Sequence, residues 1–223
     1  MGSTGSRGIV AFDLDGTLVP RTSICIHLSS WVGHHELPEL EQRYDSGEIG
    51  NRGLAELDAI YYAGRTREQV WQQLADLPLI AGVPQTVRWL NAHRLIPVIA
   101  TVTWSFAAAF LAEQHGFARV AGCEMAEDQG TLLGSVSHHF SAEDKVRFVE
   151  TLAQEQDISL ARVVAVGDSR SDIPLFEAAG LAIALNASPQ ARAAAQVQIE
   201  TENLRDLIRP IDEYFHRLGN QLH

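Results

Sequence analysis

Short apolar runs alternate with amphipathic stretches along most of this chain. The apolar runs, at residues 9–12, 95–100, 162–166 and 181–185, are continuous, which is typical of strands buried on both faces. Helical patterns separate them, at residues 84–93, 105–115, 142–156, 172–179 and 189–195. Alternating strands and helices predict an α/β fold, with a doubly wound parallel sheet covered by helices on both faces.

Residues 21–82 interrupt this alternation. They carry helical patterns at 23–32, 37–45, 52–63 and 66–77, and no convincing strand. Because this block follows the first strand directly, we interpret it as a helical cap domain inserted into a core domain of residues 1–20 and 83–223. Extended pieces within 119–136 predict a β-hairpin, and residues 204–218 predict an amphipathic helix that packs on the core.

The charge balance excludes one class of partner. The formal net charge is −11 and no basic patch stands out, so we expect no binding to nucleic acid. No apolar run approaches the length of a membrane span, and the first residues lack the apolar segment of a signal peptide, so we expect a cytoplasmic protein. Cys25 and Cys123 form no CxxC pair, and we expect two reduced thiols.

Polar side chains gather where the predicted strands end. The residues at or near these ends are Asp13, Asp15, Thr101, Asp168 and Asp172, and Lys145 opens a predicted helix. In open α/β sheets, ligands bind at the carboxyl ends of the strands. Several carboxylates in one crevice repel one another, and a hard divalent cation such as Mg²⁺ removes that repulsion. The pattern therefore predicts a magnesium site in which Lys145 and Thr101 hold phosphate oxygens.

The same residues suit phosphoryl transfer, in which the protein positions the groups and neutralises charge. Asp13 can attack phosphorus and form an aspartyl-phosphate. Asp15, two residues later, can protonate the leaving alcohol and then activate water.

Four motifs resemble those of the haloacid dehalogenase-like superfamily. Residues 13–18, DLDGTL, match its DxDGT motif, and residues 98–101 resemble the second motif, an apolar strand ending in Ser or Thr. Lys145 is similar to the third-motif lysine, and residues 167–172, GDSRSD, resemble the fourth motif, GDxxxD. The stretch 164–186 is similar to the phosphoserine-phosphatase branch, in which a four-helix cap follows the first motif.

This resemblance implies a role for each motif residue. Asp13 would be the nucleophile and a metal ligand, and Asp15 the acid and base, with its backbone carbonyl on the metal. Thr101 and Lys145 would hold the phosphoryl group. Asp168 would bind the Mg²⁺, and Asp172 would bind it or orient its waters.

The sequence departs from phosphoserine phosphatases in the substrate region. Thr22 stands where that branch has a glutamate for the substrate amine, and Asp58 aligns with the arginine that holds the substrate carboxylate. Val102 and Thr103 replace a Gly-Gly pair, and Trp104 follows them. We therefore expect a small phosphate ester without a free carboxylate, because an aspartate repels a carboxylate.

Other functions stay open. The chain could be a phosphoserine- or phosphohomoserine-type phosphatase, or a phosphotransferase or mutase that uses the same aspartyl-phosphate. A catalytically silent binding protein fits less well, because every motif residue is present. We expect a monomer or a homodimer.

Overall fold

A computed structural model describes residues 5–220 of the chain. Within them, seven strands form one sheet in the order β4-β3-β2-β1-β5-β6-β7. The strands are β1 (Gly8–Phe12), β2 (Leu95–Trp104), β3 (Arg119–Asp128), β4 (Thr131–His138), β5 (Val163–Gly167), β6 (Leu181–Leu185) and β7 (Val197–Ile199). All neighbouring strands are parallel except β3 and β4. The predicted α/β fold with a mostly parallel sheet is confirmed.

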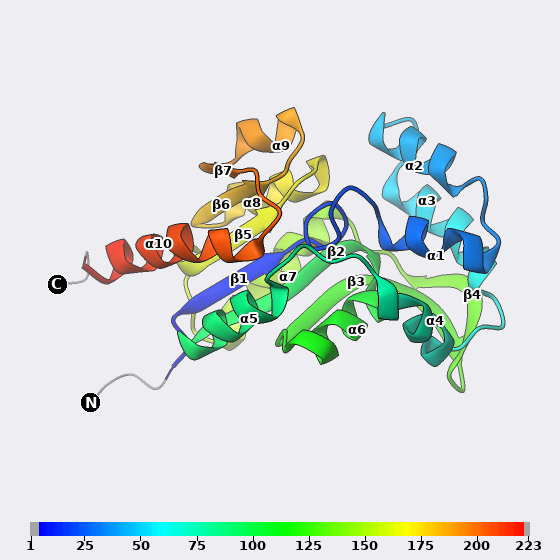
Figure 1. The fold of residues 1–223 in the computed structure, drawn as a ribbon, viewed down its shortest axis with the longest axis horizontal. Helices are drawn as coiled ribbons and strands as arrows, with labels where there is room; N and C mark the ends of the chain where they lie inside the picture. Colours follow the sequence, from blue (N-terminus) through cyan, green and yellow to red (C-terminus); the bar gives the residue numbers. More distant parts are fainter. Residues whose placement is uncertain (1–4, 221–223) are drawn as a thin grey trace.

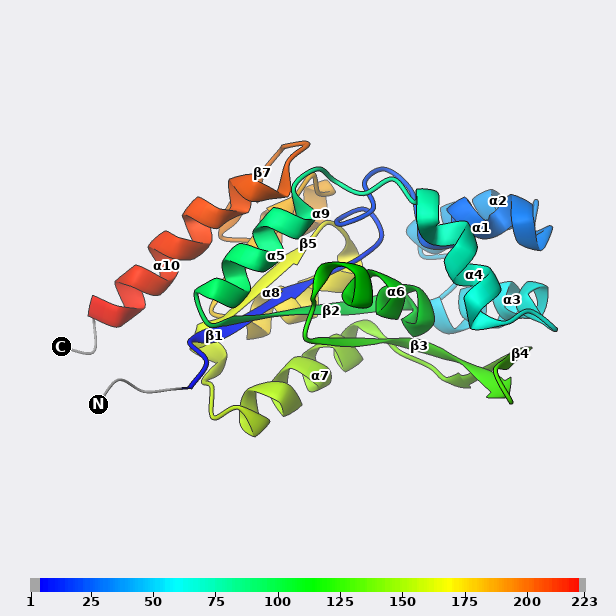
Figure 2. The same ribbon diagram turned by 60° about the horizontal axis from the view of Figure 1, so that its bottom comes forward.

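Helices cover both faces of this sheet (Figure 2). One face carries α5 (Val83–Ala92), α6 (Ser105–His115) and α10 (Ile208–Asn220), and the other carries α7 (Ala142–Glu155), α8 (Ile173–Ala178) and α9 (Pro189–Ala194). Successive side chains of a strand point to opposite faces. Accordingly, Val10 and Phe12 of β1 belong to the first apolar cluster, and Ile9 and Ala11 belong to the second.

The segment between β1 and α5 is helical and lies beside one end of the sheet (Figure 1). It holds α1 (Ile24–Val32), α2 (Leu37–Asp45), α3 (Asn51–Ala59) and α4 (Arg67–Gln73), with short 3₁₀ turns at Ile60–Tyr62 and Leu74–Asp76. The Ser23 hydroxyl caps α1 by accepting from the Ile26 amide. Thr66 and Gln69 form the capping box at the start of α4. We call residues 21–82 the inserted segment.

The β3–β4 hairpin ties the inserted segment to the sheet. β3 pairs in parallel with β2, and its outer part pairs with β4. The Gly64 amide donates to the Leu132 carbonyl (2.9 Å), and the Leu132 amide donates to the Arg65 carbonyl (2.8 Å). The hairpin was expected, but its place in the main sheet and under the inserted segment was not. Pairing between residues more than sixty positions apart leaves no periodic signal in the sequence. The boundaries at residues 20 and 83 stay a prediction.

The C-terminal part of the chain completes the opposite edge. β7 is three residues long, too short for its pattern to predict a strand. The predicted helix at 204–218 begins as a 3₁₀ turn, Leu204–Leu207, and continues as α10, whose Ile211 and Phe215 are buried against the sheet. Among the described helices, none combines the length and the apolar character needed to cross a bilayer.

Leu132→Ala tests the packing contact between the β3–β4 hairpin and the inserted segment. Leu132 is 1% exposed and belongs to the main apolar cluster, so its truncation should lower the free energy of unfolding by about 2–5 kcal/mol. The neighbouring Leu133 is 53% exposed, and Leu133→Ala should change stability by about 0.5 kcal/mol or less. Urea denaturation of both variants measures the difference, and equal effects would contradict this packing.

Candidate active site

Three strand ends bring the predicted site residues to one edge of the sheet. Asp13 follows β1, Thr101 lies near the end of β2, and Asp168 follows β5. β1 is the central strand, with Phe12 in register with Ile99 of β2 and with Val166 of β5. Parallel neighbours end at the same edge, so the three side chains lie close together although up to 155 positions separate them (168 − 13 = 155).

Three carboxylates form a compact cluster at this edge. Oxygen atoms of Asp13, Asp168 and Asp172 all lie within 4.8 Å of one another. The Thr17 hydroxyl donates to Asp168 Oδ1 at 2.9 Å. Gly16 has φ of +81°, and a Cβ there would come within 2.2 Å of the Asp168 carboxylate. The DxDGT turn therefore needs its glycine to let the first and fourth motifs approach each other.

Lys145 supplies the positive charge inside the cluster. This fully buried side chain donates to Asp13 Oδ1 at 2.9 Å, to Asp172 Oδ1 at 2.7 Å and to the Ser171 hydroxyl at 3.1 Å. Burial lowers the Lys145 pKa, but the charges of Asp13 and Asp172 and their hydrogen bonds outweigh it, so the net shift is upward. Lys145 is therefore a permanent cation next to Asp13.

One lysine does not offset all the acidic charge. Burial, and then the charge of Asp172, raise the pKa of Asp13 to about 6. Burial and the charge of Asp13 raise the pKa of Asp168 to about 8. Both carboxylates would gain from a further positive charge between them. The cluster offers the hard oxygen ligands that Mg²⁺ prefers, so these residues fit a divalent cation.

Asp172 organises the loop that carries Asp168. Its Oδ2 accepts from the backbone amides of Asp168 (3.0 Å) and Ser169 (3.1 Å), while Oδ1 accepts from Lys145. Both oxygens thus have protein partners. This geometry lets Asp172 fix the position of Asp168.

Asp15 lies beside the three-carboxylate cluster and does not belong to it. Its Oδ1 accepts from the Ile24 amide at 2.8 Å, at the start of α1. Burial raises the pKa of Asp15 to about 8, so its carboxyl group holds a proton at neutral pH. Asp15 is thereby separated from Asp13 in both position and protonation.

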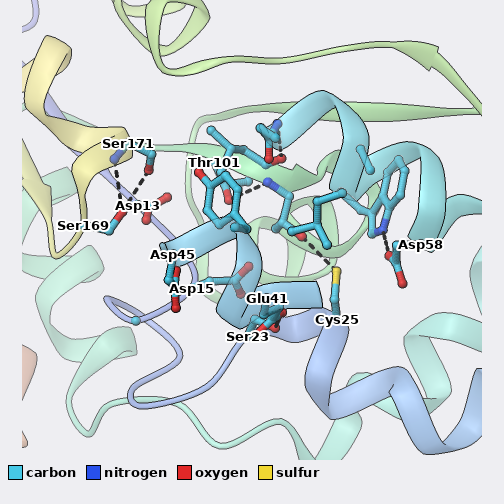
Figure 3. A pocket seen from close by; sticks show the side chains of 18 of the residues that line it. Asp13, Asp15, Ser23, Cys25, Glu41, Asp45, Asp58, Thr101, Ser169 and Ser171 are labelled. Atoms are coloured by element: carbon cyan, nitrogen blue, oxygen red, sulfur yellow. Dashed lines mark hydrogen bonds between the residues drawn. The ribbon is translucent and has the colours of Figure 1, made fainter. Parts of the chain in front are cut away.

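A cavity of about 330 Å³ opens from Asp13 and Asp15 into the inserted segment (Figure 3). Thr101 lines it, as do all five residues that the sequence suggested for specificity: Thr22, Asp58, Val102, Thr103 and Trp104. The inserted segment adds Tyr44, and also Glu41, Asp45 and Asn51, which sequence reasoning missed. Their helices were expected, but nothing in the pattern shows which face of α2 meets the core.

Asp58 is engaged by the protein itself. It is 2% exposed, its Oδ2 accepts from Trp104 Nε1 at 2.6 Å, and its Oδ1 contacts His34 Nδ1 at 3.0 Å. The His34 ring also stacks on Tyr61, with centroids 3.8 Å apart. Asp58 therefore places negative charge in the cavity wall while holding Trp104 of β2 against α3.

Comparison with known proteins decides the family. The family model described as haloacid dehalogenase-like hydrolase matches residues 10–177. The chain belongs to the haloacid dehalogenase-like hydrolases. The match covers all the strand ends described above, from β1 to the loop after β5.

Within this haloacid dehalogenase-like family, several similar relatives are phosphoserine phosphatases. The enzyme of Archaeoglobus fulgidus is 31% identical over 200 residues, covering 89% of this chain and 58% of the relative. That of Vibrio cholerae is 28% identical and is covered to 62%, so the chain spans about three fifths of these two relatives. That of Lactococcus lactis subsp. lactis is 34% identical over 93% of this chain and 97% of its own length.

Solved structures agree on the fold of this family member. A phosphoserine phosphatase described as a phospho-aspartyl intermediate analogue superimposes with a TM-score of 0.80 at 22% identity, covering 92% of this chain and 99% of the other. The probable phosphoserine phosphatase of Vibrio cholerae gives 0.79 at 25% identity, covering 96% and 67%. The chain thus lies in the phosphoserine-phosphatase-like branch.

Asp58→Ala tests whether the hydrogen bond between Asp58 and Trp104 stabilises the fold. The change leaves the buried Trp104 N–H without an acceptor, and we expect it to lower the free energy of unfolding by about 2–4 kcal/mol. Glu56→Ala on the same helix removes an exposed carboxylate that contacts Arg52 and His139, and should cost about 1 kcal/mol or less. Thermal unfolding of the two variants compares them, and an Asp58 variant as stable as the Glu56 variant would contradict this role.

Proposed function

We propose that this chain is a magnesium-dependent phosphomonoester hydrolase that works through an aspartyl-phosphate on Asp13. The observation that carries the proposal is the buried contact of Lys145 with Asp13, a residue that lines the cavity. A phosphoryl group that enters this end meets a carboxylate, an ammonium group and the Thr101 hydroxyl together. Residues 21–82 serve as the cap of this site in the proposal.

The first step forms the covalent intermediate. An Asp13 carboxylate oxygen attacks phosphorus, a new P–O bond forms, and the bond between phosphorus and the alcohol oxygen breaks. Asp15 gives its proton to the departing alkoxide, in line with the raised pKa of its carboxyl group. Lys145 and Thr101 bind the equatorial phosphoryl oxygens and reduce their charge.

The second step returns the enzyme to its starting state. Asp15, now ionised, takes a proton from a water molecule whose oxygen attacks phosphorus. The P–O bond to Asp13 breaks, inorganic phosphate leaves, and Asp15 is protonated again. Each proton that leaves Asp15 in the first step is replaced in the second.

The metal completes the charge balance. Mg²⁺ would be held by Asp13 and Asp168, with the backbone carbonyl of Asp15, while Asp172 orients the Asp168 loop. When bound, the ion neutralises acidic charge and polarises the phosphoryl group. The raised pKa values of Asp13 and Asp168 support this choice of ligands.

Asp13→Asn tests the nucleophile. The amide cannot form the acyl-phosphate, so we expect hydrolysis of an aryl phosphate in Mg²⁺ to fall by about 10³-fold or more, with the fold retained in circular dichroism. The exposed Asp128→Asn in the hairpin turn is the matched control and should leave the rate unchanged. Chelation of Mg²⁺ should abolish wild-type turnover. If Asp13→Asn kept the wild-type rate of turnover, the proposed mechanism would be refuted.

The cavity walls favour an ester without a free carboxylate. Beyond the motif aspartates, the acidic lining residues are Glu41, Asp45 and Asp58. Arg21, the basic residue of this lining, is 80% exposed and pairs with Glu202 at 2.6 Å. Burial raises the pKa of Glu41 to about 7, and the neighbouring charges of Asp45 and Asp58 add to that shift. A substrate carboxylate would increase this repulsion, whereas a neutral or cationic alcohol would not.

A substrate panel with Glu41→Gln tests this preference. We expect kcat/KM for phosphoethanolamine or glycerol phosphate to exceed that for phosphoserine by about tenfold in the wild type. Above pH 7, where the Glu41 carboxyl group is ionised, Glu41→Gln should narrow that ratio by raising kcat/KM for phosphoserine. Higher activity on phosphoserine than on every neutral and cationic ester would contradict the preference.

A phosphoserine phosphatase is the second candidate, and the names of the relatives favour it. The substrate panel separates the two. A phosphotransferase or mutase would need an added acceptor, and release of inorganic phosphate without one distinguishes a hydrolase. The cytoplasmic location and the monomeric or homodimeric state stay predictions.

A further inference from the structure

Arg170 reaches from the core to the inserted segment. It lies in the fourth motif, in a 3₁₀ turn (Arg170–Asp172) between the loop of Asp168 and α8. Its Nη2 donates to the backbone carbonyl of Tyr44 in α2, 126 positions away. Its guanidinium also lies over the Tyr44 ring, 4.5 Å from the centroid. Figure 1 shows α2 and α8, the helix that follows the Arg170 turn, on either side of the connection from β1 to α1.

The end of α2 is a favourable place for this cation. Tyr44 is the next-to-last residue of the helix, where the helix dipole is negative, and its carbonyl accepts from the Gly47 amide (2.9 Å) as well as from Arg170. The chain then turns at Gly47, which has φ of +80° and whose added Cβ would be 3.4 Å from Arg170 Nη1. The guanidinium thus lies beside both Tyr44 and Gly47 of the terminal turn. Among the described residues Arg170 forms no ion pair with a carboxylate, so its polar partner is this helix end.

The core side of the contact is rigid. Ser169 and Asp172 form a capping box around Arg170, and the Ser171 hydroxyl contacts both Ser169 (3.0 Å) and Lys145 (3.1 Å). The backbone of Arg170 therefore keeps a fixed position relative to the carboxylate cluster. On the other side, Tyr44 lines the cavity, and the charges of Asp13, Lys145 and Asp172 reach its phenol.

We propose that Arg170 and Tyr44 form a catch that holds α2 closed over the carboxylate cavity. The proposal rests on the proposed function in taking this cavity as the substrate site. Arg170 is a positioning residue, since it does not line the cavity and acts through Tyr44. Arg170 belongs to the same loop as Asp168. Closure of the inserted segment is therefore coupled to the position of the Asp168 carboxylate.

Arg170→Gln and Tyr44→Leu break the catch from its two sides. Each should raise KM for an aryl phosphate by about tenfold, the factor given by 1.4 kcal/mol, with kcat changed by about twofold or less. Tyr44→Leu removes the ring contact and keeps the backbone carbonyl, whereas Arg170→Gln removes both contacts, so the double variant should show little more than Arg170→Gln alone. Arg170→Lys keeps the charge but not the planar stacking, and should fall between Arg170→Gln and the wild type.

Hydrogen exchange of residues 37–50 gives a readout that needs no activity. Arg170→Gln and Tyr44→Leu should speed exchange in this segment and leave α10 unchanged. Arg43→Gln is the matched control, because Arg43 lies on the same helix, is exposed and pairs with Glu48 next to it. This control should match the wild type in both KM and exchange.

Two results would overturn the catch. One is wild-type exchange of residues 37–50 in Arg170→Gln. The other is a fall in kcat with KM unchanged, which would place the effect of Arg170 on the Asp168 loop alone. If Arg170→Gln fails to fold, Arg170→Lys and Tyr44→Leu decide by the same measurements. A wild type without phosphatase activity would refute the proposed function, while the exchange result would still decide the catch.

Discussion

The contact of Lys145 with Asp13 and Asp172 is the constraint on which the rest of this site depends. A fully buried ammonium group is tolerated only where carboxylates surround it, and buried carboxylates need a cation in return. The end of β1, the loop after β5 and the start of α7 must therefore meet within hydrogen-bond distance. The close approach at Gly16 follows from the same requirement, since no side chain fits between the two acidic loops.

The inserted segment changes what this charge cluster can do. The carboxylates alone form a polar edge of an α/β sheet. With α1 and α2 above them, the Asp15 carboxyl group is held by the Ile24 amide and kept apart from Asp13. Asn51 of α3 donates to the carbonyls of Val102 (3.2 Å) and Phe140 (2.8 Å), which fixes the far wall to the core. The carboxyl groups of Asp13 and Asp15 are two positions apart in the sequence but lie in different environments. Such a difference is what allows one carboxyl group to act as a nucleophile and its neighbour as an acid.

In the part of the cavity lined by Asp58, burial changes which groups a charged side chain contacts. Asp58 reads in the sequence as a residue facing the substrate, at the position of a carboxylate-binding arginine. In the structure its two oxygens contact Trp104 and His34, so its direct partners are side chains of the protein. Glu41, which the sequence did not single out, also lines the cavity and accepts a hydrogen bond from the Ser23 hydroxyl (Figure 3).

The sequence by itself determined the parallel sheet, the helical insertion and the four motifs, because these depend on local periodicity and on short runs of residues. It also pointed to Thr22, Val102 and Trp104, all of which line the cavity. Only the tertiary structure decided that the β3–β4 hairpin supports the inserted segment, that α2 turns Glu41 and Tyr44 toward the site, and that Arg170 meets Tyr44. These features depend on contacts between segments up to 126 positions apart, and the packing of two helices or strands leaves no mark on the pattern of either one.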